Sequence, residues 1–203
     1  TGIINIEANN SQSGYIQDEM ELISEDLPDG LSVLLSVEGS EGNLLSGNLS
    51  GTYSSGIYRI LGDLTIEEND MVILEPGTEF LFDGQYNFNI YGTLKAIGTE
   101  TDSIIFDNYN DSLRWRGFTL EFVTNETEFE YVRLSGAEKD NGGGMHLYYS
   151  NPTLTHVAIV NNTVEWYGGG MFLYNNSNPT LTHVTISNNT SEWNGGGMFL
   201  YDS

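Results

Sequence analysis

The sequence contains no cysteine, so disulfide bonds do not hold this fold together. It also lacks any run of 18 apolar residues and any basic stretch followed by an apolar one, so it predicts neither a membrane-spanning helix nor a signal peptide. Proline is sparse, with 4 residues in 203, whereas aromatic residues make up 12% of the chain. This composition argues against a disordered tail and for a folded core.

Basic residues are scarce, with 6 Lys and Arg against 29 Asp and Glu and a net charge of −23. All six lie between Arg59 and Lys139. Such an acidic chain is repelled by phosphate backbones and anionic membrane surfaces, so we expect neither nucleic acid nor membrane insertion. The excess of carboxylates is compatible with secretion and with a well-solvated surface.

The last third of the chain consists of an internal repeat. Residues 142–167 read GGGMHLYYSNPTLTHVAIVNNTVEWY, residues 168–194 repeat this with one insertion, and a third copy begins at Gly195. The two complete copies are identical at 20 of 26 aligned positions. A period of this length, with Gly, Asn, Ser and Pro between short apolar segments, is typical of one coil of a solenoid.

Within each unit the apolar residues alternate with period two, which predicts strands rather than helices. Stacked coils place each strand beside its copy one turn later, about 4.8 Å away and in the same direction. We therefore expect an all-β protein, a right-handed parallel β-helix (solenoid). Its inward columns comprise Met145, Leu147, Leu154, Val157, Ile159, Met171, Leu173, Leu181, Val184 and Ile186.

Pleating sends the alternate residues of one strand to the outer face of the solenoid. Two adjacent outward columns result, a flat aromatic strip that we take as the candidate binding site: His146, Phe172 and Phe199, and Tyr148, Tyr174 and Tyr201. Trp166 and Trp193, just before the glycine triplets, would widen it. Exposed aromatic residues in register often mark a binding surface. The alternatives are a ladder whose only role is to stabilise neighbouring coils, or a face that another part of the full protein covers.

The repeats also resemble a known family. GGGM, followed in the same unit by Ile159-Val160-Asn161-Asn162 or Ile186-Ser187-Asn188-Asn189, is similar to the paired GGA[ILV] and FxxN motifs of polymorphic outer-membrane-protein repeats, with Gly for Ala and Ile for Phe. More broadly the chain resembles the right-handed parallel β-helix regions of large secreted bacterial surface proteins. The resemblance covers roughly residues 142–203. It implies an extracellular or cell-surface location and supplies no catalytic residue.

The earlier part of the chain predicts a different organisation. Residues 1–50 alternate without repeating, and turn signals at Ser13-Gly14, Pro28-Asp29-Gly30 and Glu41-Gly42 predict short antiparallel strands, either the end of an immunoglobulin-like sandwich or a cap of the solenoid. Residues 51–56 (GTYSSG) are the candidate linker. The β-helix then extends over residues 57–203, and because the chain stops inside a repeat we expect it to be a fragment.

Other candidate sites have simpler explanations. Glu165 and Glu192 stack one coil apart, near the separation of about 5 Å in retaining glycosidases, but any residue repeated once per coil does so. His156 and His183 share a bend with Tyr131, which favours a stacked ladder over a metal site. Asp102 and residues 107–111 are oxygen-rich enough for Ca²⁺ but lack EF-hand spacing. Arg114 and Arg116, beside Trp115, either clasp an acidic sugar or cover the core.

The sequence thus predicts a secreted or cell-surface β-helix stalk, adhesin-like or glycan-binding, that is not enzymatic in this segment and needs no cofactor. Its expected partners are a polysaccharide or cell-surface glycan, with end-to-end self-association through open coil ends. The alternative is a carbohydrate-active enzyme, a polysaccharide lyase or glycosidase. An enzyme would need a cluster of charged groups in one cleft that is not repeated from coil to coil.

Overall fold

A computed structural model describes residues 14–24, 27–39, 43–110 and 113–202. All elements within these ranges are strands, and none of them forms a helix, so no described segment is a helix able to span a membrane. The chain divides into two compact units, residues 1–43 and 44–203.

The first unit contains a two-stranded antiparallel hairpin. Strand β1 (Gly14–Ser24) pairs with β2 (Leu27–Gly39), from Gly14 opposite Gly39 to Ser24 opposite Leu27, with an irregularity after Leu22. The antiparallel segment is confirmed, but the predicted turn at Pro28-Asp29-Gly30 is wrong. These three residues lie inside β2, because pairing of the two long alternating segments in register closes the hairpin before them.

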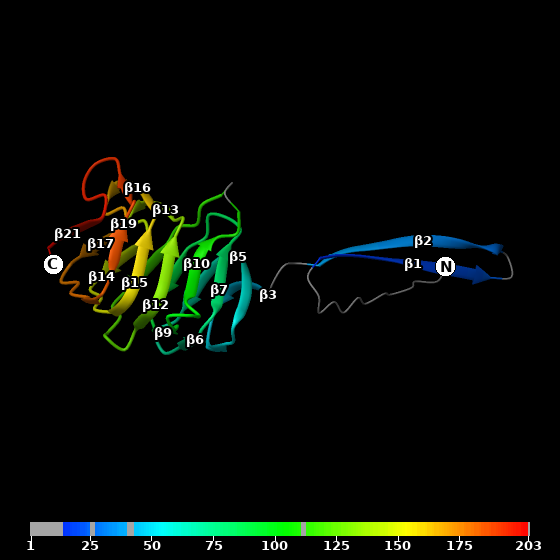
Figure 1. Ribbon diagram of the computed structural model, residues 1–203, viewed down its shortest axis with the longest axis horizontal. Coiled ribbons are helices and arrows are strands. Elements are labelled where there is room, and N and C mark those ends of the chain that lie inside the picture. Colours follow the sequence, from blue (N-terminus) through cyan, green and yellow to red (C-terminus); the bar gives the residue numbers. More distant parts are fainter. Residues whose placement is uncertain (1–13, 25–26, 40–42, 111–112, 203) are drawn as a thin grey trace. The chain divides into compact units, whose positions relative to one another are not determined.

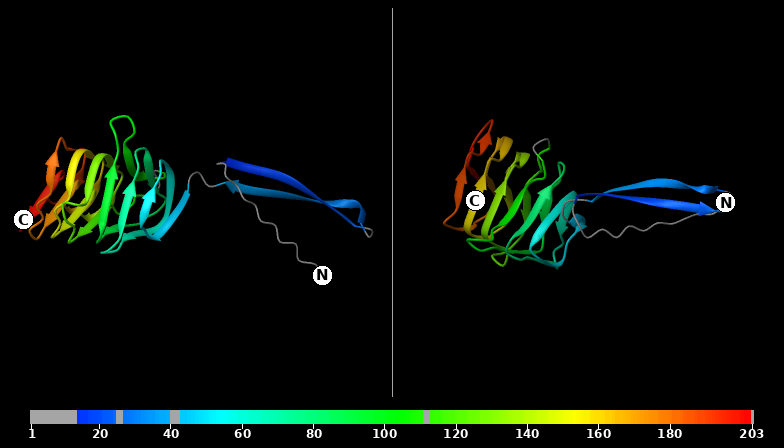
Figure 2. Two further views of the ribbon diagram at one scale, coloured as in Figure 1. Left: turned by 90° about the horizontal axis from the view of Figure 1, so that it is seen from below. Right: turned by 45° about the vertical axis from the view of Figure 1, so that its right-hand side comes forward.

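The second unit is a parallel β-solenoid of about six turns, as the repeat predicted (Figures 1 and 2). Each coil contributes to three parallel ladders. The ladder that faces the reader in Figure 1 comprises the first half of β5 (Gly56–Ile66), then β7 (Thr78–Phe82), β10 (Ile104–Asn108), β12 (Glu128–Ser135), β15 (Thr153–Val160) and β19 (Thr185–Ser187).

The second ladder runs through β4 (Gly51–Tyr53), β6 (Met71–Leu74), β9 (Thr93–Ile97), the first parts of β12 and β15, and β18 (Thr180–Thr182). The third comprises the end of β5, then β8 (Phe88–Ile90), β11 (Phe118–Glu121), β14 (Met145–Tyr148), β17 (Met171–Tyr174) and β21 (Met198–Tyr201). Strand β3 (Asn43–Asn48) pairs with β5.

A separate small sheet forms at one corner of the later coils, where β13 (Glu138–Asn141), β16 (Thr163–Tyr167) and β20 (Thr190–Ser191) pair in parallel. Residues 51–56, the candidate linker, belong instead to the solenoid. Gly51–Tyr53 forms β4 and pairs with Val72–Leu74, and Gly56 begins β5. Their Gly and Ser content reflects bends between strands rather than a flexible connection.

The core consists of the inward residues of the three ladders. Aromatic rings fill the early coils, where Phe80, Phe88, Phe106 and Phe118 are fully buried in mutual contact, and aliphatic residues fill the later ones. Most of the expected inward residues are buried, from Met145 to Leu173. Val184 and Ile186 are partly buried, and Leu181, on an outermost strand, is 40% exposed.

Polar ladders hold the corners of the coils. The buried Asn162 accepts a hydrogen bond from the Ala137 N–H at 2.9 Å and donates its Nδ2 to Asn189 Oδ1 at 3.0 Å. Such bonds satisfy backbone groups that the bend removes from the sheet. This is the physical role of the Asn that ends each repeat motif.

Candidate binding groove

The candidate groove is built on the outer face of the third ladder. Strands β14, β17 and β21 pair in exact register, so that His146, Phe172 and Phe199 form one column and Tyr148, Tyr174 and Tyr201 the other. Ring centroids are 5.1 Å apart between His146 and Phe172 and 5.7 Å apart between Phe172 and Phe199. In the tyrosine column, Tyr148 and Tyr174 are 5.5 Å apart, and Tyr174 and Tyr201 are 5.7 Å apart. The two predicted columns are therefore present.

Exposure differs strongly within the two columns. Phe172 is only 9% exposed, whereas Tyr201 is 57% exposed and Tyr174 lies between them. At these centroid separations the rings overlap in an offset manner, which leaves part of a face or edge open along the column. Phe172 thus forms a floor, and the tyrosines present the accessible surface.

The sequence did not predict that the strip has a wall. Strands β13 and β16 of the small sheet end in Asn141 and Tyr167, which are in register, and an isolated parallel bridge pairs Tyr167 with Asn194 beyond β20. The Tyr167 ring stacks on Phe199, with centroids 4.7 Å apart, and also contacts Phe172. The strip is therefore not flat but forms one side of a groove.

The glycine triplets explain how the wall folds back over the floor. The first glycine of each triplet has a positive φ, which is +62° at Gly142, +68° at Gly168 and +67° at Gly195. A Cβ at Gly142 would lie 2.8 Å from the Cα of His146. Only glycine combines this left-handed conformation with such a close approach.

The groove has a volume of about 390 Å³ and is lined by one amide and five aromatic side chains: Asn141, Tyr167, Phe172, Tyr174, Phe199 and Tyr201. None of these described lining residues is charged, although the chain carries a net charge of −23. Such a surface can hold an apolar face of a ligand but offers no counter-ion for an anionic group.

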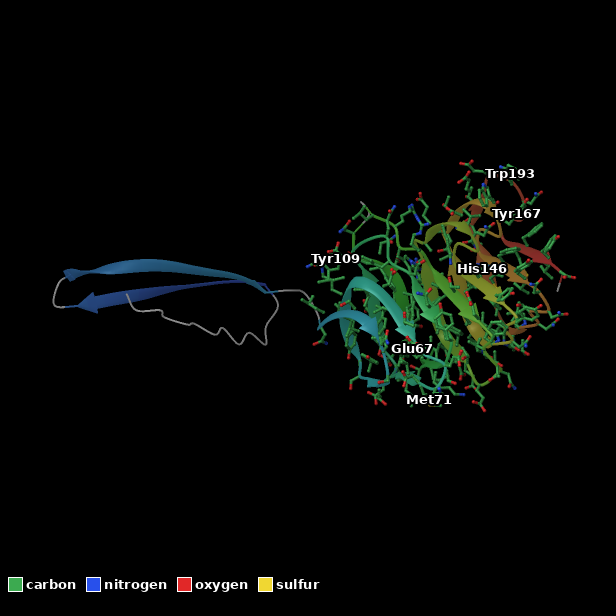
Figure 3. All side chains as sticks on the ribbon, turned by 180° about the vertical axis from the view of Figure 1, so that it is seen from behind. Glu67, Met71, Tyr109, His146, Tyr167 and Trp193 are labelled. Carbon is green, nitrogen blue, oxygen red and sulfur yellow. The ribbon has the colours of Figure 1, made fainter. Side chains whose placement is uncertain are left out.

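Two buried polar atoms near the groove have no hydrogen-bond partner among the described residues: Asn141 Oδ1 and His146 Nε2. His146 lies in the third ladder, with Tyr167 and Trp193 in the same later coils (Figure 3). Burial, with a smaller contribution from the nearby Lys139, lowers the pKa of His146 to about 4, so its imidazole is neutral at physiological pH. Asn141 Oδ1 and His146 Nε2, the two unpartnered atoms, both lie at the end of the groove where Asn141 is.

Further exposed aromatic residues extend the surface beyond the groove. Phe122 and Tyr149 stack with centroids 5.5 Å apart, and Tyr149 contacts Tyr148 at 4.8 Å. Phe122 is 64% exposed and both residues have positive φ. They lie at coil corners outside the repeated columns, so the repeat alone could not reveal them.

The two tryptophans are exposed, as expected for a wider aromatic surface, with Trp166 at 40% and Trp193 at 66%. Trp193 contacts Tyr167 edge-on, with centroids 6.2 Å apart. Tyr167, rather than either tryptophan, is the residue that lines the groove.

A second, polar cleft of about 280 Å³ runs along the small sheet. Its charged lining residues are Arg116, Glu138, Lys139, Asp140, Glu165 and Glu192. Lys139 Nζ donates to Thr119 Oγ1 at 2.6 Å, and Arg116 forms an ion pair with Asp140 at 3.9 Å. Burial, and secondarily the charge of Arg116, lowers the pKa of Lys139 to about 8. The predicted pair Glu165 and Glu192 thus lies in a charged cleft.

The remaining candidate residues have structural partners. The bend ladder is confirmed, because Tyr131, His156 and His183 stack with successive centroids 4.6 Å apart. Trp115 is fully buried against Phe82, and Arg114 pairs with Glu138 at 3.6 Å.

The oxygen-rich segment does not converge on one point within the described residues. Asp107 accepts a hydrogen bond from Ser135 at 2.6 Å, and Asp102 accepts one from Thr101 at 2.7 Å. No cluster of three His, Cys, Asp or Glu able to hold a metal ion occurs in the described ranges. Asp111 lies outside them.

A scan of the chain against protein-family models finds no match, and searches of curated proteins and of solved structures find none either. The parallel β-solenoid and its two grooves therefore carry the functional argument by themselves.

Proposed function

We propose that this chain is part of a secreted or cell-surface β-solenoid that binds a neutral polysaccharide through its aromatic groove. The observation that carries the proposal is the groove itself, in which five aromatic side chains meet one amide and no charged group. Sugar rings have apolar faces that pack on aromatic rings, and their hydroxyls pair with amides. A neutral glycan is the ligand that this lining fits best.

Charge narrows the class of ligand. The described residues from Gly142 onward include Glu165, Glu192 and Asp202 and contain no Lys or Arg. An anionic glycan approaching this part of the surface would be repelled over roughly a Debye length of about 8 Å at physiological salt. A neutral polysaccharide meets no such barrier.

The repeated aromatic columns also favour weak binding of the ligand at each coil, with an overall affinity that rises with the number of coils the ligand contacts. Contacts to one or two rings contribute only about 0.5–1.5 kcal/mol each beyond burial. A polymeric ligand that meets several coils at once gains affinity through effective concentration. This is how an adhesin-like stalk would hold a cell-surface or matrix glycan.

The proposed location rests on the repeat motifs. The GGGM units with their ladder-forming Asn162 and Asn189 resemble polymorphic outer-membrane-protein repeats of bacteria, and the acidic, cysteine-free composition is compatible with secretion. The solenoid would then act as a stalk that displays the groove outside the cell.

The proposal is tested by presenting the protein with a panel of immobilised neutral and acidic polysaccharides. We expect retention on one or more neutral polymers that changes little between 50 and 500 mM NaCl, values chosen so that the Debye length falls several-fold. Retention on acidic polymers alone, or retention abolished by salt, would contradict the proposal.

The polar cleft favours a second candidate function, that of an enzyme acting on polysaccharides. Arg116, Glu138, Lys139 and Asp140 form a charged cluster that is not repeated from coil to coil, as such an enzyme would require. An amine with a pKa near 8 is a competent base close to neutral pH.

Measuring the release of reducing ends or unsaturated products from the same polysaccharide panel tests this candidate. Activity that Lys139→Met abolishes and the control Lys95→Met retains, Lys95 being a half-buried lysine paired with Glu128 outside the cleft, would support an enzyme. Absence of turnover on every polymer that the protein binds would contradict the enzyme candidate and leave glycan binding as the only proposed function.

A further inference from the structure

We infer that the bound polysaccharide lies parallel to the solenoid axis, with about one sugar ring per coil and one end of the bound segment hydrogen-bonded to Asn141. This inference rests on the proposed glycan-binding function and adds the orientation and register of the ligand. It concerns an extended, β-linked neutral polysaccharide.

The wall of the groove determines the orientation. Tyr167, at the end of β16, stacks on Phe199 and contacts Phe172, so it closes the floor on the side where the small sheet lies. A polysaccharide running along the strands would collide with this ring. A chain running along the columns passes beside it, because the wall strands and the floor strands both stack along the same axis.

The spacing of the columns matches a polymer that runs in this direction. Coils repeat at the parallel strand spacing of about 4.8 Å, which is close to the advance of one pyranose ring in an extended β-linked chain. The rings of Tyr174 and Tyr201 therefore fall under successive sugars, with centroids 5.7 Å apart. A ligand that runs along the strands, across the solenoid axis, does not place one sugar over each coil.

Asn141 makes the two ends of the groove different. It lines the groove, and its Oδ1 is a buried acceptor without a partner in the described structure. Leaving a buried acceptor unpaired is costly, by about 1–3 kcal/mol. A hydroxyl from a ligand satisfies this atom, whereas a carboxylate oxygen, which is also an acceptor, cannot.

Asn194, at the far end of the wall column, does not line the groove, and the exposed Tyr201 bounds the groove there. The amide at one end and the tyrosine at the other define a direction for the ligand. His146 Nε2, the second unpartnered polar atom, lies on the floor strand β14 beside Phe172.

The inference is tested with neutral oligosaccharides of one to six sugars, taken from whichever polymer the panel identifies, and with a spin label on the reducing end. Calorimetry should show affinity rising roughly three- to tenfold per added sugar, then levelling once the two lining coils are filled. The spin label should broaden amide signals at one end of the groove only, near residues 142–146 or near 199–201.

Two variants separate the contribution of the Tyr201 ring to binding from that of the Asn141 amide. Tyr201→Ala should lower the affinity of the longer oligosaccharides and leave the affinity of the shortest that binds unchanged, because the shortest ligand is held at Asn141; a loss confined to the shortest ligand would overturn the inference. Asn141→Leu should cost at least fivefold for all lengths, whereas Asn178→Leu, an exposed amide outside the groove, should cost nothing.

The outcomes distinguish this inference from the proposed function. Binding that is independent of length, or broadening that follows a single strand from Phe172 towards Asn175, overturns the axial orientation while the groove remains a glycan site. Equal effects of Asn141→Leu and Asn178→Leu overturn the role of Asn141. Absence of binding for every oligosaccharide and polymer overturns the proposed function as well.

Discussion

Tyr167 stacks on Phe199, a residue 32 positions later in the chain, so the wall of one coil packs on the floor of the next. This contact joins the small sheet to the third ladder and gives the groove its shape. It also makes the groove a property of at least two coils together rather than of one repeat.

Tyr167→Ala should therefore open the groove and destabilise the solenoid. Ring–ring contacts of this kind contribute about 0.5–1.5 kcal/mol beyond area burial, so we expect the free energy of unfolding in urea to fall by about 1–2 kcal/mol. Trp193→Ala is the matched control, because that ring is 66% exposed and touches Tyr167 only at its edge. Equal losses in the two variants would show that Tyr167 is not a packed wall.

The depressed pKa of His146 predicts acid sensitivity. Above pH 6.5 the His146 imidazole is neutral in both the folded and the unfolded chain. Below pH 6.5 the unfolded chain binds a proton at this imidazole, whereas the folded protein binds that proton only near pH 4. Stability should therefore fall as the pH drops through this window, by roughly 2 kcal/mol at pH 5, since one pKa unit corresponds to about 1.4 kcal/mol.

His146→Phe should remove this particular loss, because phenylalanine occupies the same column position at Phe172 and Phe199. Urea unfolding at pH 7 and pH 5 provides the measurement, and all other titrating groups cancel in the difference between variant and parent. Parallel stability profiles of the two proteins would rule out a neutral buried imidazole at this position.

The third glycine of each triplet provides a test of coil stacking. An added Cβ at Gly144 would lie 2.6 Å from the carbonyl oxygen of Gly170, so Gly144→Ala should cost about 1–3 kcal/mol through overpacking. At Gly197 the same Cβ would meet only the Ile186 Cγ2 atom, at 3.6 Å. Gly197→Ala is then the control and should have little effect on the urea midpoint.

Asn162→Leu should destabilise the corner ladder. The substitution leaves the Ala137 N–H, which now donates to Asn162 Oδ1, without its partner, at a cost of about 1–3 kcal/mol. The exposed Asn178→Ala should stay within about 0.5 kcal/mol of the parent in the same unfolding experiment. If leucine is tolerated equally well, the ladder is dispensable and the repeat motif needs another explanation.

The solenoid could be predicted from the sequence because two near-identical copies fix the register of every strand. Met145 opposite Met171, and His146 opposite Phe172, follow directly from aligning the repeats and from the period-two alternation. The bend ladder followed for the same reason, since Tyr131 aligns with His156 and His183.

The wall of the groove could not be predicted in this way. Its positions, Asn141, Tyr167 and Asn194, differ between copies, so the repeat offers no signal for a shared role. Their placement depends on the backbone reversal at the glycine triplets, where the left-handed φ of Gly168 turns β16 back over the next strand. Three successive glycines allow many turns, and sequence alone does not say which one forms.

The two incorrect local predictions have a related cause. Pro28-Asp29-Gly30 and residues 51–56 carry strong turn or linker composition, yet the former lies within β2 and the latter contributes β4. In both cases pairing with a neighbouring strand, the long β1 for the former and the short β6 for the latter, outweighs a local preference for a bend. Composition indicates where a bend is possible, and the partner strand decides whether it forms.

The central claim is that the aromatic groove binds a neutral polysaccharide, and isothermal calorimetry on one matched pair of variants tests it most directly. Tyr174→Ala removes a groove ring, and Tyr131→Ala removes a ring of the bend ladder outside the groove. Circular dichroism first establishes that both variants are folded. We then expect Tyr174→Ala to weaken binding of the neutral polymer identified by the panel at least fivefold, and Tyr131→Ala to leave that binding unchanged. Equal affinity of the two variants would contradict the account.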